Sequence, residues 1–205
     1  VSLSASSGRT VSVTYATDDN TATEPADYTS AAGTLTFLPG ETTKTVSVAV
    51  QGDTLDEEDK SFLVNLDNLT NAGIGDGQGV GTITDDDPLP TLSIGDVTLS
   101  EGYNGIANAQ FTVTLSAQSG KTVSVAYATD DDTAAAPADY TATDGVLTFL
   151  PGETTKTLVV AVKNDALDED DETFLVNLDT PVNATLVHGQ GVDAAVRTDR
   201  QRGRI

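Results

Sequence analysis

The acidic residues of this chain are clustered, and the densest run, Asp85-Asp86-Asp87, is closed by Pro88 and Pro90 and lies between two stretches of similar sequence. Three adjacent carboxylates repel one another, since two like charges about 4 Å apart cost roughly 4 kcal/mol at an effective dielectric of about 20. Water offsets this repulsion in an open loop, whereas a bound cation offsets it where further acids gather. The run is therefore either a solvated linker or part of a cation site.

The charge balance of the whole chain favours the same kind of ligand. The 205 residues include 32 acidic and only 10 basic ones, for a net charge of -22. Such a chain repels phosphates and anionic lipids, so we expect no nucleic acid partner and no membrane insertion. The absence of cysteine excludes disulfides and cysteine zinc sites. Cations are the expected partners.

Polar and apolar residues alternate in several stretches that are separated by turns rich in Gly, Pro and Asp. Clear examples are Thr10–Tyr15, Thr45–Val50 and Ser61–Leu66. Alternation with a period of two is typical of half-buried strands, and no window of helical period is long enough to compete. The pattern predicts an all-β chain with the architecture of an antiparallel sandwich.

An internal repeat divides the chain. Asp27-Tyr28 recurs as Asp139-Tyr140, 112 positions later, and the same offset relates 34–45 to 146–157 without a gap. A unit of this length fits a β-sandwich of roughly 100 residues, so we expect two tandem domains. The predicted organisation is a first repeat over 1–87, a second repeat over 88–196 and a divergent tail over 197–205.

The two repeats are incomplete at opposite ends. Val1 matches Val113, so the first repeat has no counterpart of 91–112, and we expect it to lack its first strands. A sandwich without an outer strand exposes unpaired backbone groups, which predicts self-association through the first repeat. In the second repeat, Arg197-Thr198-Asp199 replaces the acidic triplet. Two interpretations of this basic tail stay open: sequence foreign to the repeat, or a natural basic terminus.

Several short motifs occur in a fixed order, most of them twice. They are Ser-Glu-Gly (100–102), Ala-Asp-Tyr, Leu-Thr-Phe-Leu-Pro-Gly-Glu, Asp-x-Leu-Asp-Glu before Phe-Leu-Val-Asn-Leu, and Gly-x-Ile-Thr-Asp-Asp-Asp. This combination resembles Calx-beta repeats over nearly the whole chain. The resemblance implies two tandem immunoglobulin-like antiparallel β-sandwiches, the first one truncated at its N-terminus. Such domains are known from sodium-calcium exchangers, an integrin subunit and bacterial surface proteins, and the exchanger type binds calcium at one tip.

The resemblance also implies which residues hold the metal. The ligands would come from the Ser-Glu-Gly glutamate, the Ala-Asp-Tyr aspartate, the acids that follow the Lys-Thr-x-x-Val-x-Val strand, and the terminal triplet. The implied ligands are Asp27, Asp53, Glu57, Asp85, Asp86 and Asp87 in the first repeat, and Glu101, Asp139, Asp165 and Glu169 in the second. The first set lacks a counterpart of Glu101 and the second lacks the triplet, so we expect fewer ions or weaker binding.

The chemistry of these residues agrees with calcium, which takes about six to eight oxygen ligands from carboxylates and carbonyls. The alternative is that Asp56–Asp59 and Asp168–Asp171 are solvated turns that keep the strand edges soluble. Both interpretations concern loops at the ends of strands, so only the placement of the side chains distinguishes them.

These expectations lead to a non-enzymatic calcium-binding module of a larger secreted or cell-surface protein, with Ca²⁺ rigidifying an array of neighbouring repeats for adhesion or display. The alternatives are a purely structural spacer and a calcium-sensing regulatory domain of a membrane transporter. Paired acids also serve glycoside hydrolysis. Here they recur in tandem copies, which is more typical of structural ligands than of an active site.

Overall fold

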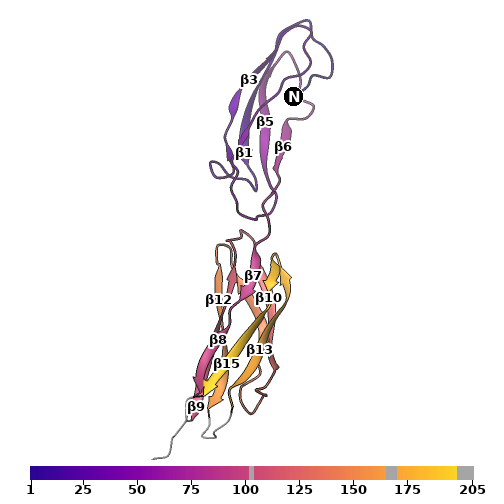
Figure 1. Ribbon diagram of the computed structural model, residues 1–205. Helices are drawn as coiled ribbons and strands as arrows, with labels where there is room; N and C mark the ends of the chain where they lie inside the picture. The colour runs from indigo at the N-terminus through magenta and orange to yellow at the C-terminus, as the bar shows by residue number, and fades with distance from the viewer. Residues whose placement is uncertain (102–103, 165–169, 198–205) are drawn as a thin grey trace, which may run out of the picture. The chain divides into compact units, whose positions relative to one another are not determined.

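The computed structural model describes residues 1–101, 104–164 and 170–197, and the chain divides into two compact units (Figure 1). Unit 1 comprises Val1–Thr54 and Glu58–Asp86, and unit 2 comprises Leu55–Glu57 and Asp87–Ile205. All regular elements in the described ranges are strands. The all-β prediction is confirmed.

Unit 1 contains one substantial sheet. Its four strands lie in the order β3-β1-β5-β6, and all neighbouring pairs are antiparallel. A second sheet is reduced to two residues from each of two strands. The strands are β1 (Val11–Asp19), β2 (Tyr28–Thr29), β3 (Ala32–Phe37), β4 (Ala49–Val50), β5 (Lys60–Thr70) and β6 (Gln78–Ile83).

Unit 2 is a complete β-sandwich. A five-stranded sheet, β11-β10-β13-β15-β8, and a four-stranded sheet, β12-β9-β7-β14, make up its two layers. The strands are β7 (Thr91–Ile94), β8 (Val97–Glu101), β9 (Gly105–Leu115), β10 (Val123–Asp131), β11 (Asp144–Phe149), β12 (Thr155–Asn164), β13 (Glu172–Val182), β14 (Thr185–His188) and β15 (Gln190–Arg197).

Two strand pairs of unit 2 depart from the antiparallel expectation: β14 is parallel to β7, and β15 is parallel to β8. The chain changes sheet between β7 and β8, which are separated only by Gly95 and Asp96. The Asp96 carboxylate accepts a hydrogen bond from Val192 N at 2.9 Å, which ties this crossing to β15. β7 lies between β9 and β14 in one sheet, and β8 is the edge strand of the other. The direction of this segment makes the last pair of each sheet parallel.

The core of unit 2 follows from the alternation along its strands. Every second residue of β9 points inward, so Ala109, Phe111 and Val113 are fully buried. The Tyr140 ring stacks on Phe174 with centroids 4.4 Å apart, and Phe111 meets Phe174 edge-on at 6.0 Å. One continuous apolar cluster therefore fills the space between the two sheets.

The predicted strand Thr45–Val50 forms only in part, since strand structure is limited to Ala49–Val50. In unit 2 the equivalent β12 pairs with β9 along its whole length, starting at Thr155 opposite Thr114. Unit 1 repeats the start of this pairing, with Ser2 opposite Thr43 and Lys44 N donating to Val1 O at 2.9 Å. Beyond this pairing, residues 45–48 belong to no strand.

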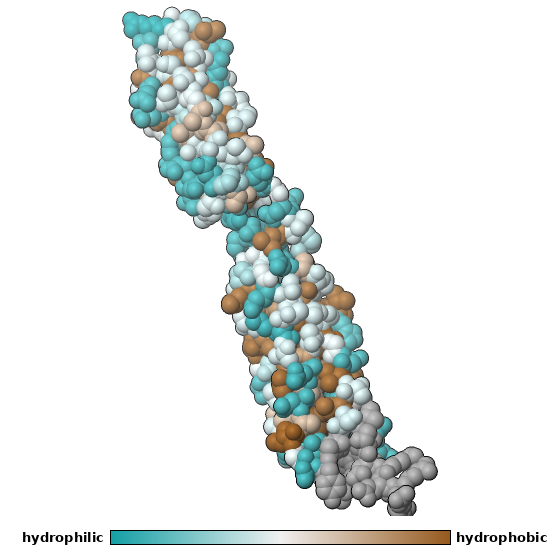
Figure 2. Space-filling view, turned by 90° about the vertical axis from the view of Figure 1, so that its left-hand side faces the viewer, coloured by the Kyte–Doolittle hydropathy of each residue, from teal (hydrophilic) through white to brown (hydrophobic). Residues whose placement is uncertain are grey.

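Residues of intermediate hydropathy and hydrophilic residues together cover most of the face shown in Figure 2, and hydrophobic residues lie between them. Exposed apolar residues such as Val80, Ile106 and Val187 occur in both units. In the ranges that the structure describes, no helix has the length and hydrophobicity needed to cross a membrane.

Candidate metal centre

The Ala-Asp-Tyr aspartate of unit 1 lies in the turn that leads into β2, and other groups already bind its carboxylate. Thr23 N donates to Asp27 Oδ2 at 2.7 Å, which closes the turn, and the ammonium of Lys60 donates to Asp27 Oδ1 at 2.7 Å. Burial acts to raise the pKa of Asp27, but the hydrogen bonds from Lys60 and Thr23 outweigh it and hold the pKa below its ordinary value. The Asp27 carboxylate is therefore already paired with a positively charged group, the ammonium of Lys60, in this structure.

Acids from other segments meet at the same end of the sheet. Lys60 is the first residue of β5 and pairs with Ile83 at the end of β6. Directly beyond this pair, Asp85 N donates to Asp59 Oδ1 at 3.0 Å. Three segments that are far apart in the sequence thus converge here. We call this group, Asp27, Asp59, Lys60 and Asp85, the acidic end of unit 1.

The other implied ligands of the first repeat are distributed less tightly. Asp53 and Asp86 are exposed members of unit 1, whereas Glu57 and Asp87 belong to unit 2. Within the described residues, no three Asp, Glu or His side chains form a group that could hold a metal ion. The structure therefore brings Asp27 and Asp85 to one end of unit 1 and does not gather the whole implied set.

The donor chemistry of the acidic end fits calcium, because carboxylate oxygens are the ligands that this hard cation prefers. The contact between Lys60 and Asp27 shows that the acids already attract a positive charge at this place. A calcium ion that used the same Asp27 oxygen would have to displace the lysine ammonium. Because the described residues contain no group of three such side chains that could hold a metal ion, Asp27, Asp59 and Asp85 could hold the ion together only after their side chains rearranged.

Lys60 was missed by reasoning from the sequence, although a signal for it exists. At an offset of 112 residues Lys60 corresponds to Glu172, the first residue of β13. The same position thus carries a positive charge in one repeat and a negative charge in the other. A comparison of charge along the two repeats would have identified it.

In unit 2 the structure describes only part of the implied set. Asp139 repeats the turn of Asp27, with Ala135 N donating to its Oδ2 at 2.8 Å. The backbone of Glu101 ends β8 directly opposite Arg197 of β15. Asp165 and Glu169 lie outside the described residues. Where the first repeat has the aspartate triplet, unit 2 therefore places the backbone of a basic residue opposite an implied ligand.

The interpretation of Asp56–Asp59 as a solvated turn is wrong at its first residue. Asp56 is grouped with unit 2 and is only 3% exposed. Its carboxylate accepts hydrogen bonds from Lys121 Nζ at 2.8 Å and from Ser119 Oγ at 3.0 Å. The charge of Asp56 is thus neutralised by a lysine, and the residue has a structural role.

A repeated tyrosine fixes the loop beside each Ala-Asp-Tyr turn. The Tyr28 hydroxyl donates to Asp19 Oδ1 at 2.7 Å, and the Tyr140 hydroxyl donates to Asp131 Oδ1 at 2.6 Å. Burial, together with the hydrogen bond to the neighbouring aspartate, raises the pKa of both tyrosines to about 12. These rings and their aspartates hold the hairpins in place, as a buried aromatic ring with a hydrogen-bonded hydroxyl can do.

A buried carboxyl in unit 2 was not foreseen. Asp193 of β15 is fully buried, and neither of its oxygens has a hydrogen-bond partner among the described residues. Burial raises its pKa to about 6. The equivalent residue of the first repeat is Gly81, where an added Cβ would lie 2.3 Å from the Phe62 ring. Unit 2 thus carries an acid where unit 1 has room only for glycine.

Comparison with known proteins identifies the family of the chain. The Calx-beta domain family matches residues 1–87 and 85–198. Human sodium/calcium exchanger 2 is 32% identical over 190 residues, which cover 82% of this chain and 20% of that protein. Sodium/calcium exchanger 1 of Canis lupus familiaris is 32% identical over 193 residues, covering 84% of this chain and 20% of that protein. The chain thus spans about a fifth of the length of these relatives.

Two solved structures align with parts of the chain. The apo form of the Calx CBD1 domain aligns with a TM-score of 0.47 and 24% identity, covering 55% of this chain and all of that one. A structure of the calcium binding domain CBD12 of CALX1.1 aligns with a TM-score of 0.39 and 26% identity, covering 85% of this chain and 68% of that one. Since the family matches nearly all of the sequence in two successive copies, the chain belongs to the Calx-beta family as a tandem pair of Calx-beta domains.

Proposed function

We propose that this tandem pair is a non-catalytic calcium-binding module, and that unit 1 holds the ion at its acidic end. The observation that carries the proposal is the convergence of Asp27, Asp59 and Asp85 around the first residue of β5. Hard oxygen donors from separate loops at one end of a sheet are a suitable calcium site. Family membership supports the same ligand.

Unit 2 is proposed to bind calcium more weakly. Its sequence has Arg197-Thr198-Asp199 where the first repeat has three aspartates. A positive side chain near a site lowers its affinity for a cation because the two charges repel. Binding in unit 2 would depend on Glu101, Asp139, Asp165 and Glu169.

In its biological setting, the module is proposed to belong to a larger secreted or cell-surface protein, where calcium rigidifies successive repeats for adhesion or display. The acidic composition suits an environment in which calcium is abundant. A second candidate is regulation of a membrane transporter by calcium. It is favoured by the 32% identity to sodium/calcium exchangers over 190 residues.

Isothermal titration calorimetry with calcium, and separately with magnesium, tests the binding function. We expect saturable calcium binding and much weaker magnesium binding, because magnesium demands octahedral geometry and releases its water reluctantly. The double variant Asp27→Asn and Asp85→Asn should lose most of the calcium heat. Replacement of Asp67, an exposed acid of β5 outside the implied set, by Asn is the matched control. Absence of calcium binding at millimolar concentration would leave the spacer interpretation.

A further inference from the structure

Three successive residues of unit 2 recognise the buried Asp56. The Ser119 hydroxyl donates to Asp56 Oδ2 at 3.0 Å, and Lys121 Nζ donates to Oδ1 at 2.8 Å. Between them, the Gly120 N–H donates to the backbone carbonyl of Asp56 at 2.9 Å. Residues 119–121 thus bind both the side chain and the backbone of one aspartate, and we call them the aspartate-binding turn of unit 2.

The middle position of this turn must be glycine for the bound segment to fit. The segment Leu55–Glu57 is grouped with unit 2, and a Cβ on Gly120 would lie 2.7 Å from Glu57 Cγ and 3.3 Å from the Asp56 carbonyl oxygen. The backbone of Gly120 itself does not adopt a positive φ. Glycine is therefore needed here because another segment approaches closely.

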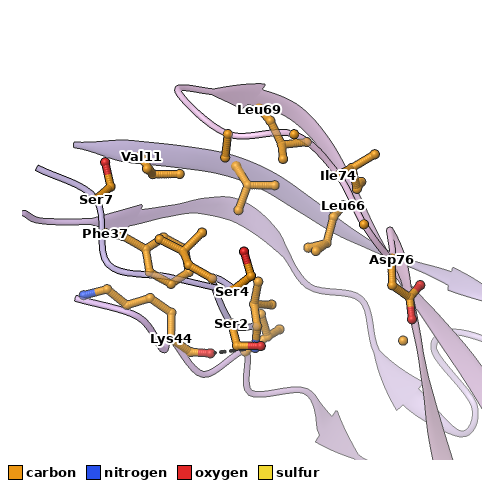
Figure 3. Close-up of a pocket in the computed structure, with 18 of the residues that line it drawn as sticks. Ser2, Ser4, Ser7, Val11, Phe37, Lys44, Leu66, Leu69, Ile74 and Asp76 are labelled. Carbon is orange, nitrogen blue, oxygen red and sulfur yellow. Dashed lines mark hydrogen bonds between the residues drawn. The ribbon is translucent and has the colours of Figure 1, made fainter. Parts of the chain in front are cut away.

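Unit 1 contains the same turn at residues 7–9, and its internal hydrogen bonds are the same. Arg9 N donates to Ser7 Oγ at 3.0 Å, and Gly40 N donates to the Ser7 carbonyl at 3.0 Å. The two equivalent bonds of unit 2 also measure 3.0 Å. Figure 3 shows the Ser7 hydroxyl pointing away from the Phe37 ring. The turn is thus formed in unit 1 before any acidic segment binds to it.

No acidic segment lies over this turn in the described parts of the chain. Gly8 is exposed, and a Cβ added to it would meet nothing within 4 Å. Arg9 is exposed as well and forms no ion pair with any described residue. A guanidinium can bind a carboxylate through two parallel hydrogen bonds, so arginine suits this position at least as well as the lysine of unit 2.

We propose that residues 7–9 of unit 1 bind an acidic segment of the Leu-Asp-Glu type, presented by a loop of another Calx-beta repeat. Its aspartate carboxylate binds the Ser7 hydroxyl and the Arg9 guanidinium, and its backbone carbonyl accepts from the Gly8 N–H. Leu55–Glu57 of this chain are held in unit 2 and do not fill the site. The contact needs no metal ion, so the inference does not depend on calcium binding.

Nuclear magnetic resonance of the ¹⁵N-labelled full chain tests the proposal. The probe is a synthetic peptide with the sequence of residues 51–60 and blocked ends, which contains Leu-Asp-Glu. We expect saturable shifts of the Gly8 and Arg9 amide signals at about millimolar peptide, because a partly exposed ion pair contributes little. High salt should weaken the binding, since it screens the attraction between the charges.

Two substitutions separate binding at the turn from general charge attraction. Gly8→Val has open space in free unit 1 but should abolish binding, because the same position of unit 2 leaves no room for a Cβ. Arg9→Gln should weaken binding by about threefold to tenfold. Arg9→Lys is the matched control and should keep the affinity, because unit 2 uses Lys121 in this role. A peptide with Asp56→Asn should bind more weakly than the original.

The proposal is wrong if the Gly8 and Arg9 signals do not move with several equivalents of peptide at about millimolar concentration. It is equally wrong if the Gly8→Val chain binds the peptide as tightly as the wild type. Shifts confined to residues 119–121 would show that the peptide recognises the turn of unit 2 alone, which also overturns the assignment to unit 1.

Discussion

The two units have closely similar sequences, yet they differ in how deeply their strands are buried. Unit 2 has one apolar cluster that spans both sheets, whereas unit 1 has two separate clusters with three buried residues each. Val176 is fully buried, but the equivalent Val64 is only partly so. Burial is thus a property of the completed sandwich and does not follow from the alternation of a strand alone.

The same substitution in both units should therefore have different effects on stability. Phe174 is 2% exposed and contacts Tyr140 and Phe111, whereas Phe62 is 6% exposed and stacks on Tyr28 alone. We expect Phe174→Ala to lower the free energy of unfolding of unit 2 by about 3 to 5 kcal/mol, as in well-packed cores. Phe62→Ala should cost unit 1 clearly less, because its smaller core collapses more readily around the gap.

Differential scanning calorimetry of the wild type and the two variants measures this contrast. Each substitution should shift one of two melting transitions, which also assigns the transitions to the units. Equal losses in both units would show that the core of unit 1 is as well packed as that of unit 2, contrary to the burial of their side chains.

The next largest effect is a change of stability with pH, and it comes from Asp193, a buried acid without an acidic counterpart in unit 1. Asp193 is buried with a pKa raised to about 6, against about 3.9 for an ordinary aspartate. Below about pH 4 the carboxyl is protonated in the folded and unfolded states, so it costs little. As the pH rises from about 4 to 6, the unfolded state loses its proton first, and the folded state is destabilised by up to about 3 kcal/mol.

Asp193→Ala should therefore stabilise unit 2 at pH 7.5 and have a smaller effect at pH 4. Part of the gain is offset by the volume that the shorter side chain leaves behind. Urea unfolding of wild type and variant at the two pH values measures the difference. A stability difference that does not change with pH would mean that Asp193 is ionised, and its charge satisfied, in the folded protein.

Reasoning from the sequence predicted the repeat, the all-β class and the strands at Thr10–Tyr15 and Ser61–Leu66, because these depend on local alternation and on self-similarity. It predicted a complete strand at Thr45–Val50, where strand structure is limited to Ala49–Val50, since pairing depends on a neighbour that local pattern does not contain. The parallel pairs of β7 and β8 were missed for the same reason.

The candidate site was less predictable than the fold. Family motifs name the acids, but the ion pair of Asp27 with Lys60 and the burial of Asp56 depend on contacts between residues that are distant in the sequence. Asp193 is an acidic residue at an interior position of its strand, where the alternation of polar and apolar residues predicts an apolar side chain. Side-chain partners of charged residues are set by tertiary structure, and so they are the part that local patterns predict worst.

The core substitution has its larger effect in unit 2, whereas calcium should have its larger effect in unit 1. We expect calcium to stabilise unit 1 more than unit 2. An ion that binds only the folded state stabilises it by RT ln(1 + [L]/Kd), or about 1.4 kcal/mol at ten times Kd. Unit 1 keeps the acidic triplet, whereas unit 2 has Arg197 in its place. The transition assigned to unit 1 should rise further in calcium than in chelator at matched ionic strength. A larger shift of the unit 2 transition would contradict this expectation.

The smallest expected effect is a change in calcium affinity when Lys60, the lysine at the acidic end of unit 1, loses its charge. Lys60 Nζ lies 2.7 Å from Asp27 Oδ1, so calcium binding through that oxygen must first break this ion pair and then accommodate a nearby positive charge. An exposed or partly exposed pair of this kind contributes roughly 0.2 to 1 kcal/mol. Lys60→Gln, which removes the charge and keeps a polar, unbranched side chain one atom shorter, should therefore tighten calcium binding by about twofold to fivefold in calorimetry. The converse change, Glu172→Lys at the equivalent position of unit 2, should weaken calcium binding there. Lys44→Gln is the control, because that lysine pairs with Glu41 outside the acidic end.

If Lys60→Gln left the calcium affinity unchanged, or lowered it, the ion would not compete with this lysine. The site of unit 1 would then have to be built without the Asp27 oxygen that Lys60 occupies.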